Sequence, residues 1–407
     1  MAGPLSHVRV LDLSRIMAGP WAGQILADLG ADVVKVERPG AGDDTRGWGP
    51  PYLKDAAGKD TGEAAYFASV NRNKKSVTLD ISKAEGQAIV RELAGKCQVL
   101  IENYKVGTLA RYGLSYEDLR KDNPGLVYCS VTGFGQDGPY APRPGYDFIF
   151  QGMGGLMSIT GERDGQPGAG PQKVGIAITD VLTGMYASVA ICAALTHRER
   201  TGLGQYIDAA LLDTIVAFNA NQIVSFFCSG RLPVRYGNAH PQVVPYEVFP
   251  TADGHIILAV GNDGQFKRFC EVAGCSELAE EARFKTNSQR IIHRAELIPL
   301  IAEIMRTRSK QEWIEVLEAA TVPCGPINNM KEVFEDPQVR HRELRVDIPH
   351  PLGGVAPVVA SPMRLSETPV EYRLAPPLLG QHTAEVLKGL LGKSDADIAA
   401  LKSSGLV

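Results

Sequence analysis

The sequence has few of the residue patterns from which metal sites or disulfide frameworks are built. Its seven cysteines are scattered through 407 residues without a C-x-x-C pair, and its eight histidines include no H-E-x-x-H motif. Zinc sites need closely spaced ligands, and disulfide frameworks belong mainly to short secreted chains. We therefore expect free thiols in a reducing compartment and no bound metal.

Long apolar runs and an excess of basic residues are also missing. The most apolar segment, residues 181–195, is shorter than a membrane span and is followed by THRER. The first residues run directly into a strand-like pattern and show no signal or transit peptide. The net charge of −4 does not suit nucleic-acid binding, which needs a basic surface. The sequence predicts a cytoplasmic protein that binds neither membrane nor nucleic acid.

What the sequence does contain is a regular alternation of strand and helix patterns. Residues 8–14 have a strand pattern, 17–30 a helical one and 31–40 a second strand pattern, which together predict a βαβ unit. The alternation continues with a helix at 85–97, a strand at 97–104, a helix at 115–123 that Ser115 caps, and strands at 125–135 and near 205–213. This order predicts an α/β fold with an open, mostly parallel sheet.

The pattern changes further along the chain. A loop rich in glycine and proline is expected from 133 to about 175, and a helix is expected after Asp180. From residue 229 a hairpin at 246–261 and several helices predict a smaller α+β domain. The last part is extended and rich in proline, and it closes with the helical segment HTAEVLKGLLG. The predicted segments are 1–228, 229–330 and 331–407.

Asp180 is the only carboxylate in GIAITDVLTGMYASVAICAAL, residues 175–195. One interpretation is a helix N-cap, because aspartate is favoured there and a helical run follows. A second interpretation is compatible with the first. Amides and the dipole at a helix N-terminus stabilise an anion, and poor hydration in an apolar pocket makes a carboxylate more nucleophilic. Asp180 is therefore a candidate nucleophile as well as a candidate cap.

Other patterns suggest ligand binding. GFGQDG, residues 133–138, matches G-x-G-x-x-G, but PYAPRPGYD follows and cannot form the helix that an NAD fingerprint requires. The glycine-rich stretches 152–161 and 261–265 are either tight turns or backbone that approaches a ligand closely. Basic residues in separate turns are either surface charges or an anion site for nucleotide phosphates. They are Arg38, Lys74, Lys75, Arg111 and Arg143.

Several motifs, taken together and in this order, resemble the family III CoA-transferases, the CaiB/BaiF family that includes formyl-CoA transferase. The motifs are VLDLSRIMAGPWAGQILADLGADVVKVERPGAGDDTRGW, NRNKKSVTLD, IENYKVGTLARYG, ITDVLTGMYASVAICAAL with HRERTGLGQYIDAALLD, VPCGPINNMKEVFEDPQV and APPLLGQHT. The resemblance covers nearly the whole chain. It implies a Rossmann-like large domain built from both chain ends, a smaller α+β domain and an interlocked homodimer.

The resemblance also assigns roles to individual residues. It places the catalytic aspartate at Asp180, and it implies no permanently bound cofactor because CoA and its thioesters are substrates. The implied CoA contacts are Arg38, Lys75, Asn103, Arg111 and Arg143. A flap that excludes water is expected at Gly261, Gly264 and Gln265, although this turn is shorter than the run of consecutive glycines in formyl-CoA transferase.

The implied reaction moves CoA from an acyl-CoA to a free carboxylic acid through an aspartyl anhydride and an aspartyl-CoA thioester. We expect succinyl-CoA and glutarate or a similar short dicarboxylate, with Arg46 either holding a distal carboxylate or serving the structure. Two alternatives stay open. An α-methylacyl-CoA racemase would need a histidine where Tyr146 stands, and tyrosine is a poor base at neutral pH. A non-catalytic CoA-binding protein would not need a carboxylate in an apolar pocket.

Overall fold

The computed structural model describes residues 3–407, which form two compact units. The first unit comprises Met1–Leu156, Lys173–Cys228 and Arg340–Val407, and the second comprises Met157–Gln172 and Ser229–Val339. Segments near both ends of the chain thus contribute to the first unit, as predicted. The structure adds residues 157–172 to the smaller unit and extends it to Val339, beyond the predicted limits of 229 and 330.

A six-stranded sheet forms the centre of the first unit, and all of its neighbouring strands are parallel. Its order is β5-β2-β1-β6-β7-β8, which confirms the predicted parallel α/β fold. Side chains alternate between its faces, so that Val10 points to one hydrophobic core and Leu11 to the other. The strands are β1 (Arg9–Asp12), β2 (Asp32–Glu37), β5 (Lys74–Thr78), β6 (Val99–Glu102), β7 (Val127–Thr132) and β8 (Tyr206–Ala210).

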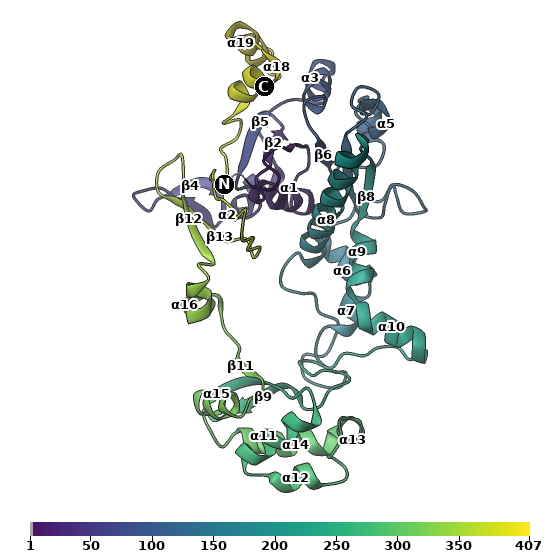
Figure 1. The fold of residues 1–407 in the computed structure, drawn as a ribbon, viewed down its shortest axis with the longest axis vertical. Helices are drawn as coiled ribbons and strands as arrows, with labels where there is room; N and C mark the ends of the chain where they lie inside the picture. The colour runs from purple at the N-terminus through teal and green to yellow at the C-terminus, as the bar shows by residue number, and fades with distance from the viewer. Residues whose placement is uncertain (1–2) are drawn as a thin grey trace. The chain divides into compact units, whose positions relative to one another are not determined.

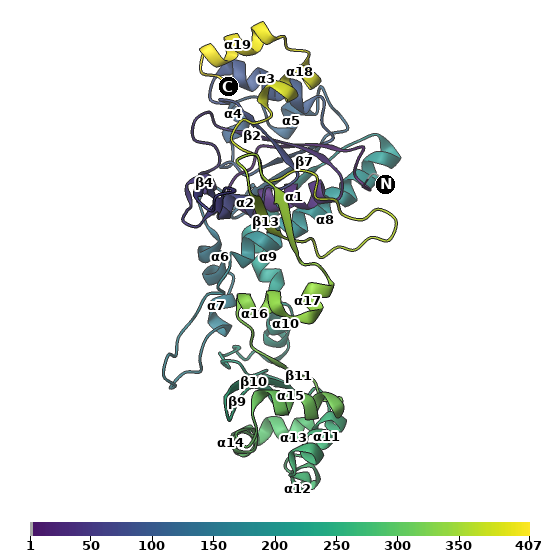
Figure 2. The same cartoon turned by 90° about the vertical axis from the view of Figure 1, so that its left-hand side faces the viewer.

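Helices cover both faces of this sheet. One face packs against α1 (Ala18–Asp28), α6 (Asp147–Met153), α8 (Ile178–Thr201) and α9 (Leu211–Phe218). The other face packs against α3 (Ala84–Ala94), α4 (Thr108–Arg111), α5 (Tyr116–Leu119), α18 (Thr383–Leu391) and α19 (Asp395–Ser403). The last two helices, yellow in Figures 1 and 2, lie beside α3, so residues far apart in sequence complete one core.

The strand order creates a natural binding crevice. From the central pair β1 and β6, the chain builds the sheet outward to β2 and β5 on one side and to β7 and β8 on the other. The loops after β1 and β6 therefore leave the sheet in opposite directions at its carboxyl edge. In open α/β sheets ligands bind in the crevice at this switch point.

Smaller elements complete the two units. Two antiparallel pairs belong to the first unit, β3 (Tyr52–Lys54) with β4 (Asp60–Ala64) and β12 (Arg345–Pro349) with β13 (Val355–Val359). The short helices are η1 (Asp44–Gly47), α2 (Ala65–Ala68), α7 (Leu156–Ile159), α10 (Ala220–Ser229), α16 (Met330–Glu335) and α17 (Pro337–His341). The prediction of an uninterrupted loop from 133 to 175 was wrong, because α6 and α7 lie within that stretch.

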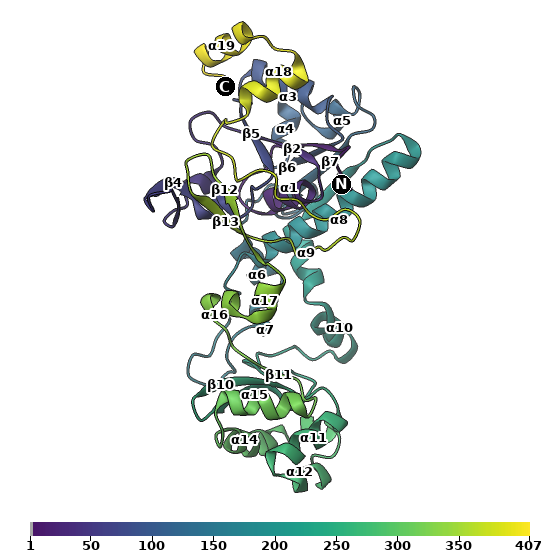
Figure 3. The same ribbon diagram turned by 60° about the vertical axis from the view of Figure 1, so that its left-hand side comes forward.

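The second unit has its own sheet and core. Figure 3 shows its strands with helices on one side, and Phe249, Leu258, Phe269 and Trp313 are fully buried between the two layers. The predicted hairpin is confirmed as β9 (Tyr246–Thr251) and β10 (Gly254–Ala259), with β11 (Cys324–Pro326) beside it. The helices are α11 (Asp263–Ala273), α12 (Ser276–Glu280), α13 (Asn287–Ile292), α14 (Arg294–Met305) and α15 (Lys310–Ala319).

Helix α8 is long and apolar enough by composition to cross a membrane, and so is the bent pair α9–α10 if the pair is counted as one span. In the first unit α8 packs against α1 and the sheet, and Ala187, Ile191 and Ala194 are fully buried there. An apolar helix of a protein core passes the same test of length and composition. Its composition therefore reflects packing between α1 and the sheet.

Candidate active site

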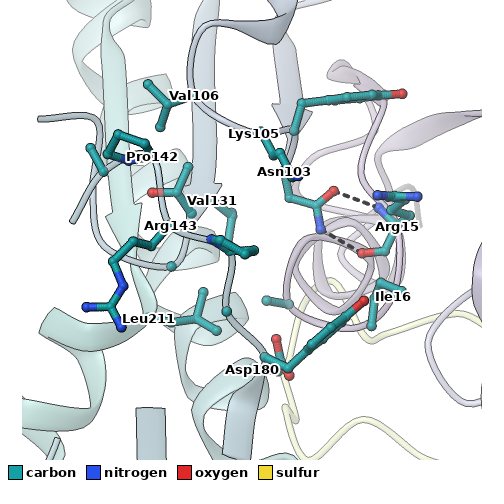
Figure 4. Close-up of a pocket in the computed structure, with 18 residues that line it drawn as sticks. Arg15, Ile16, Asn103, Lys105, Val106, Val131, Pro142, Arg143, Asp180 and Leu211 are labelled. Atoms are coloured by element: carbon teal, nitrogen blue, oxygen red, sulfur yellow. Dashed lines mark hydrogen bonds between the residues drawn. The ribbon is translucent and has the colours of Figure 1, made fainter. Parts of the chain in front are cut away.

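A cleft opens at the carboxyl edge of the sheet in the first unit. Its volume is about 950 Å³, part of which is open to solvent, and it is lined by the loops after β1, β6, β7 and β8 and by the start of α8. Figure 4 shows Asp180 and Leu211 at one end of this cleft and Val106 and Lys105 at the other. Three of the predicted site residues line it together, namely Asn103, Arg143 and Asp180.

Asp180 is the third residue of α8, so it lies inside the first turn and does not cap the helix. The prediction of an N-cap was wrong, because the helix begins at Ile178 and Ala177 precedes it without a side-chain cap. No group among residues 3–407 donates a hydrogen bond to the Asp180 carboxylate. Burial raises the pKa of Asp180 to about 7, and the neighbouring carboxylate of Asp147 adds to the rise. Asp180 is thus an unpaired carboxylate that faces a cleft and is poorly hydrated.

Two residues that the sequence did not single out lie near Asp180. Burial raises the pKa of the Tyr66 phenol, and the carboxylates of Asp180 and Asp147 raise it further. Asp147 accepts a hydrogen bond from the backbone N–H of Thr179, which directly precedes Asp180, at 2.7 Å. A phenol and a second carboxylate therefore share the surroundings of the candidate nucleophile.

Asn103 lines the cleft, but both functions of its amide are used within the protein. Its Nδ2 donates to the carbonyl of Arg15 at 2.7 Å, and its Oδ1 accepts from the N–H of Arg15 at 3.0 Å. Figure 4 draws both bonds. The loops after β1 and β6 are thereby joined across the switch point, and the side chain of Arg15 stays exposed beside the cleft.

Cationic side chains border the cleft. Arg143 is exposed and its guanidinium lies over the ring of Tyr140 at 4.5 Å and near that of Phe134 at 5.3 Å. Arg15 and Lys105 also line the cleft and are exposed. Arginine stacked on aromatic rings keeps its charge and loses little freedom when it binds an anion.

Arg38 lines a second cleft at the carboxyl ends of β1, β2 and β5, which encloses about 980 Å³. Arg15 and Tyr104 line both clefts, so the two adjoin. Beneath the second cleft, Lys35 and Asp43 form a fully buried ion pair at 2.9 Å. Burial alone would raise the pKa of Asp43, but Lys35 and hydrogen bonds with Thr45 lower it to about 2. Arg38 is thus an exposed cation at the second cleft. The nearby carboxylate of Asp43 is neutralised by its ion pair with Lys35.

Lys75 and Arg111 are not brought into either cleft. Lys75 lies near the amino end of β5, away from the carboxyl edge, and forms ion pairs with Asp32 at 3.3 Å and Glu385 at 3.2 Å. Arg111 is exposed on α4, where it donates to Thr108 Oγ1 at 3.4 Å. The structure therefore does not support grouping them with Arg38 and Asn103 around one ligand.

Arg46 is held inside the first unit. Its guanidinium donates to Glu37 and Glu63 at 2.8–3.1 Å and to the carbonyl of Pro377 at 3.0 Å, and it stacks on Phe67 at 3.6 Å. Its side chain is 10% exposed. With its donors engaged in this way, Arg46 is not free to hold a substrate carboxylate. The geometry fits the other interpretation, in which Arg46 stabilises the first unit.

The predicted flap residues belong to the second unit and form the start of α11. The Gly261 N–H donates to Gln265 Oε1 at 2.7 Å, and Asn262 caps the helix through the N–H of Gln265. Gly261 and Gly264 are exposed. The turn is thus a helix cap held by hydrogen bonds, and the backbone at Gly261 and Gly264 is exposed to solvent.

Comparison with known proteins identifies the family. The sequence model described as CoA-transferase family III matches residues 5–383. The chain belongs to this family. A succinate–glutarate CoA-transferase from Agrobacterium fabrum (strain C58 / ATCC 33970) is 52% identical over 387 residues, which cover 95% of this chain and 96% of that protein. The human succinyl-CoA:glutarate CoA-transferase is 43% identical over 404 residues, which cover 99% of this chain and 90% of that protein.

The fold of this family III CoA-transferase matches a solved relative. The crystal structure of a CAIB/BAIF family protein from Brucella suis superimposes with a TM-score of 0.84 at 46% identity, covering 96% of this chain and all of that one. The chain is therefore a CoA-transferase, and CoA thioesters are its substrates. The resemblance seen in the sequence is confirmed, whereas the assignment of individual residues to CoA stays a prediction.

Proposed function

We propose that the protein transfers CoA from succinyl-CoA to glutarate or a similar short dicarboxylate, with Asp180 as the nucleophile. The observation that carries this proposal is the unpaired Asp180 carboxylate in a cleft at the switch point of the sheet. The relatives named above, which act on succinyl-CoA and glutarate by name, supply the choice of substrates.

In the first half of the proposed reaction, an Asp180 oxygen attacks the thioester carbonyl of succinyl-CoA. CoA thiolate leaves and a succinyl–aspartyl anhydride forms. The thiolate then attacks the aspartyl carbonyl, which releases succinate and leaves an aspartyl-CoA thioester. The pKa of Asp180, at about 7, gives an ionised fraction at neutral pH together with the high basicity that a carboxylate nucleophile needs.

The second half reverses these steps with the acceptor. A glutarate carboxylate attacks the aspartyl thioester, CoA thiolate leaves, and the thiolate then attacks the glutaryl carbonyl of the new anhydride. Glutaryl-CoA forms and the Asp180 carboxylate is regenerated. Both anhydrides would react with water, so the site must exclude it. The turn around Gly261 and Gly264 belongs to the second unit, and its role in excluding water stays a prediction.

The two adjoining clefts suggest how CoA binds. Phosphates of the nucleotide would meet Arg38 and Arg15, because exposed arginines at the carboxyl edge of a parallel sheet suit phosphate groups. The pantetheine arm would then pass Tyr104, which lines both clefts, and bring the thioester to Asp180. Arg143 lines the cleft that contains Asp180 and adds a further cation along the proposed path of CoA.

An oxygen-18 experiment tests the proposal directly. With glutarate labelled in both carboxylates, each turnover passes one labelled oxygen to Asp180. Either oxygen of Asp180 can attack in the next turnover, so about half of the succinate is labelled at first, and all of it once both oxygens have exchanged. We expect label in succinate, a mass gain on the peptide that contains residue 180 of 2 Da after one turnover and 4 Da after many, and no transfer by Asp180→Asn. Labelled succinate formed by Asp180→Asn would overturn the role of Asp180. Scrambling of an α-methylacyl-CoA centre without transfer would instead indicate a racemase, and binding without turnover a CoA-binding protein.

We also infer that the protein forms a homodimer. Several apolar side chains of the first unit are exposed, and large exposed apolar surfaces usually mark contacts between proteins. They include Phe148, Ile176, Met185, Tyr186 and Val189, which lie on α6 and on or just before α8. Light scattering after size-exclusion chromatography should give twice the mass of the 43.8 kDa chain.

A further inference from the structure

We propose that Asp147 and Gln151 of α6 are positioning residues for Asp180, because their side chains hold the start of α8 in place of a local cap. The proposal rests on the function proposed above, in which Asp180 is the nucleophile. It goes further by assigning a role to two residues that do not contact substrate.

Asp147 supplies the cap that α8 lacks. Its Oδ1 accepts the N–H of Thr179 at 2.7 Å, and its Oδ2 accepts Gln151 Nε2 at 2.6 Å. The residue before the helix is Ala177, which has no side chain able to satisfy a backbone amide. Amides of the first helical turn need an outside partner. A residue 33 positions before Asp180 in the sequence therefore sets the position of the turn that carries it.

Gln151 ties down the segment that leads into α8. It is fully buried, its Oε1 accepts the N–H of Val174 at 2.8 Å, and its Nε2 also lies 3.3 Å from the carbonyl of Ile176. Gly175 and Ile176 themselves are exposed and contribute little packing. The place of Asp180 in the cleft thus depends on α6, which is anchored by the fully buried ring of Phe150 against Phe134.

The same contact puts a second carboxylate beside the nucleophile. Asp147 forms no ion pair with any residue of the described chain, and its two oxygens accept hydrogen bonds from Gln151 Nε2 and from the N–H of Thr179. A like charge makes Asp180 harder to ionise and so more basic. The other titratable or charged groups facing this end of α8 are Tyr66 from α2 and the residues lining the cleft, Arg15, Tyr104, Lys105, Arg143 and Tyr146.

Carbodiimide labelling measures the effect on Asp180 without any turnover. A water-soluble carbodiimide with an amine modifies protonated carboxyl groups, and Asp180 is the only carboxylate in the tryptic peptide of residues 174–198. In the wild type we expect half-maximal labelling near pH 7. In Asp147→Asn, which removes the charge and keeps an acceptor for the Thr179 N–H, the midpoint should fall by at least about 0.5 pH unit.

Turnover gives a second readout. Asp147→Asn should move the acid limb of kcat to lower pH, because Asp180 ionises more easily. It should also lower kcat at pH 8.5 by about 10-fold or more, because the new amide nitrogen cannot accept the hydrogen bond from Gln151 Nε2 and alignment is lost. The KM for succinyl-CoA should stay within about twofold, since neither residue lines either cleft. Gln151→Met keeps the charge of Asp147, so it should lower kcat without moving the labelling midpoint.

The control removes a helix cap elsewhere in the first unit. Ser394 caps α19 with a capping box, and Ser394→Ala should lower the unfolding temperature without moving the labelling midpoint or kcat. Asp147→Ser retains a cap acceptor and replaces Asp147→Asn should that variant not fold.

An unchanged labelling midpoint with kcat within about twofold of the wild type would overturn the proposal. Loss of the fold in both variants would also overturn it, by assigning Asp147 a structural role. Absence of transfer in the wild type would reject the proposed function alone, because the labelling midpoint still reports on Asp147.

Discussion

Asn103 and Arg15 are joined by two reciprocal hydrogen bonds between a side-chain amide and a backbone, at 2.7 and 3.0 Å. They connect the loop after β1 with the loop after β6, the two loops that diverge at the switch point of the sheet. The bonds hold Arg15 where the two clefts adjoin. The amide of Asn103 therefore shapes the binding crevice by joining the two loops that border it.

Asn103→Ala should open this connection and weaken CoA binding. We expect the KM for succinyl-CoA to rise about 10-fold with a smaller change in kcat, and stability to fall by about 1–2 kcal/mol for two lost hydrogen bonds. Steady-state kinetics and urea unfolding measure both. Asn123 offers a matched control, because its amide bonds the carbonyls of Ala94 and Cys97 away from the clefts. Asn123→Ala should lose similar stability and keep its KM, and equal KM values for both variants would contradict this role for Asn103.

Arg38 and Lys75 should differ in their effect on CoA affinity, although the resemblance assigns both to CoA. Arg38→Ala should raise the KM for succinyl-CoA by about 10-fold or more, because it removes an exposed cation at the carboxyl edge. Lys75→Ala should leave it within about twofold, since Lys75 already pairs with Asp32 and Glu385. Arg120, an exposed residue at the C-cap of α5, serves as a charge-matched control. A larger rise for Lys75→Ala than for Arg38→Ala would place CoA elsewhere.

Arg46→Ala should act on stability. The change leaves the carboxylate of Glu37, 1% exposed, without its guanidinium partner, and removing one member of a buried pair costs about 3–5 kcal/mol. Thermal unfolding should show a large loss. Activity that remains in the folded fraction should keep the wild-type KM for glutarate. A raised KM for glutarate with unchanged stability would restore the interpretation of Arg46 as a substrate ligand.

The parallel sheet could be predicted because five of its six strands lie in segments with a strand pattern that alternate with helical patterns, whereas β5 (Lys74–Thr78) was not predicted. The cap at Ser115 and the hairpin of β9 and β10 followed from local turn and cap chemistry, and both are present. Helix α6 could not be predicted in the same way. It is seven residues long, only Phe150 and Gln151 are buried on it, and glycine and proline surround it. Its stability comes from packing that the local sequence does not reveal.

The site could be predicted only where the signal was local. A single carboxylate in an apolar segment pointed to Asp180, a basic residue in a turn pointed to Arg143, and the resemblance to the family implied Asn103. Asp147 gave no signal of its own, because its partner, Thr179, is brought to it by the tertiary fold. The sequence left both interpretations of Arg46 open for the converse reason. Glu63 and Pro377, which occupy its guanidinium, lie far from it in sequence.

The raised pKa of Asp180 also predicts that activity and stability depend on pH in opposite directions. The folded state raises this pKa from its ordinary value of 3.8 to about 7, so the folded protein holds the proton more tightly than the unfolded chain. The stability linked to this proton is fully present below about pH 4 and is lost as the pH rises through 7. Turnover has the opposite dependence, because only the carboxylate is nucleophilic, and kcat should fall as the pH drops through 7.

Asp180→Asn should therefore abolish transfer and stabilise the protein at pH 8. Because the side chain is partly exposed, we expect a gain of about 1–3 kcal/mol in the free energy of unfolding at pH 8 and almost none at pH 4. Asp213, exposed in the first turn of α9, is a matched control. Its carboxylate interacts favourably with the dipole at the N-terminus of α9, so Asp213→Asn should lower stability at pH 8 by about 0.3–1 kcal/mol. Urea unfolding at the two pH values measures both variants. A loss of stability in Asp180→Asn at pH 8 would mean that the carboxylate is paired in solution, and an unpaired nucleophile would then be excluded.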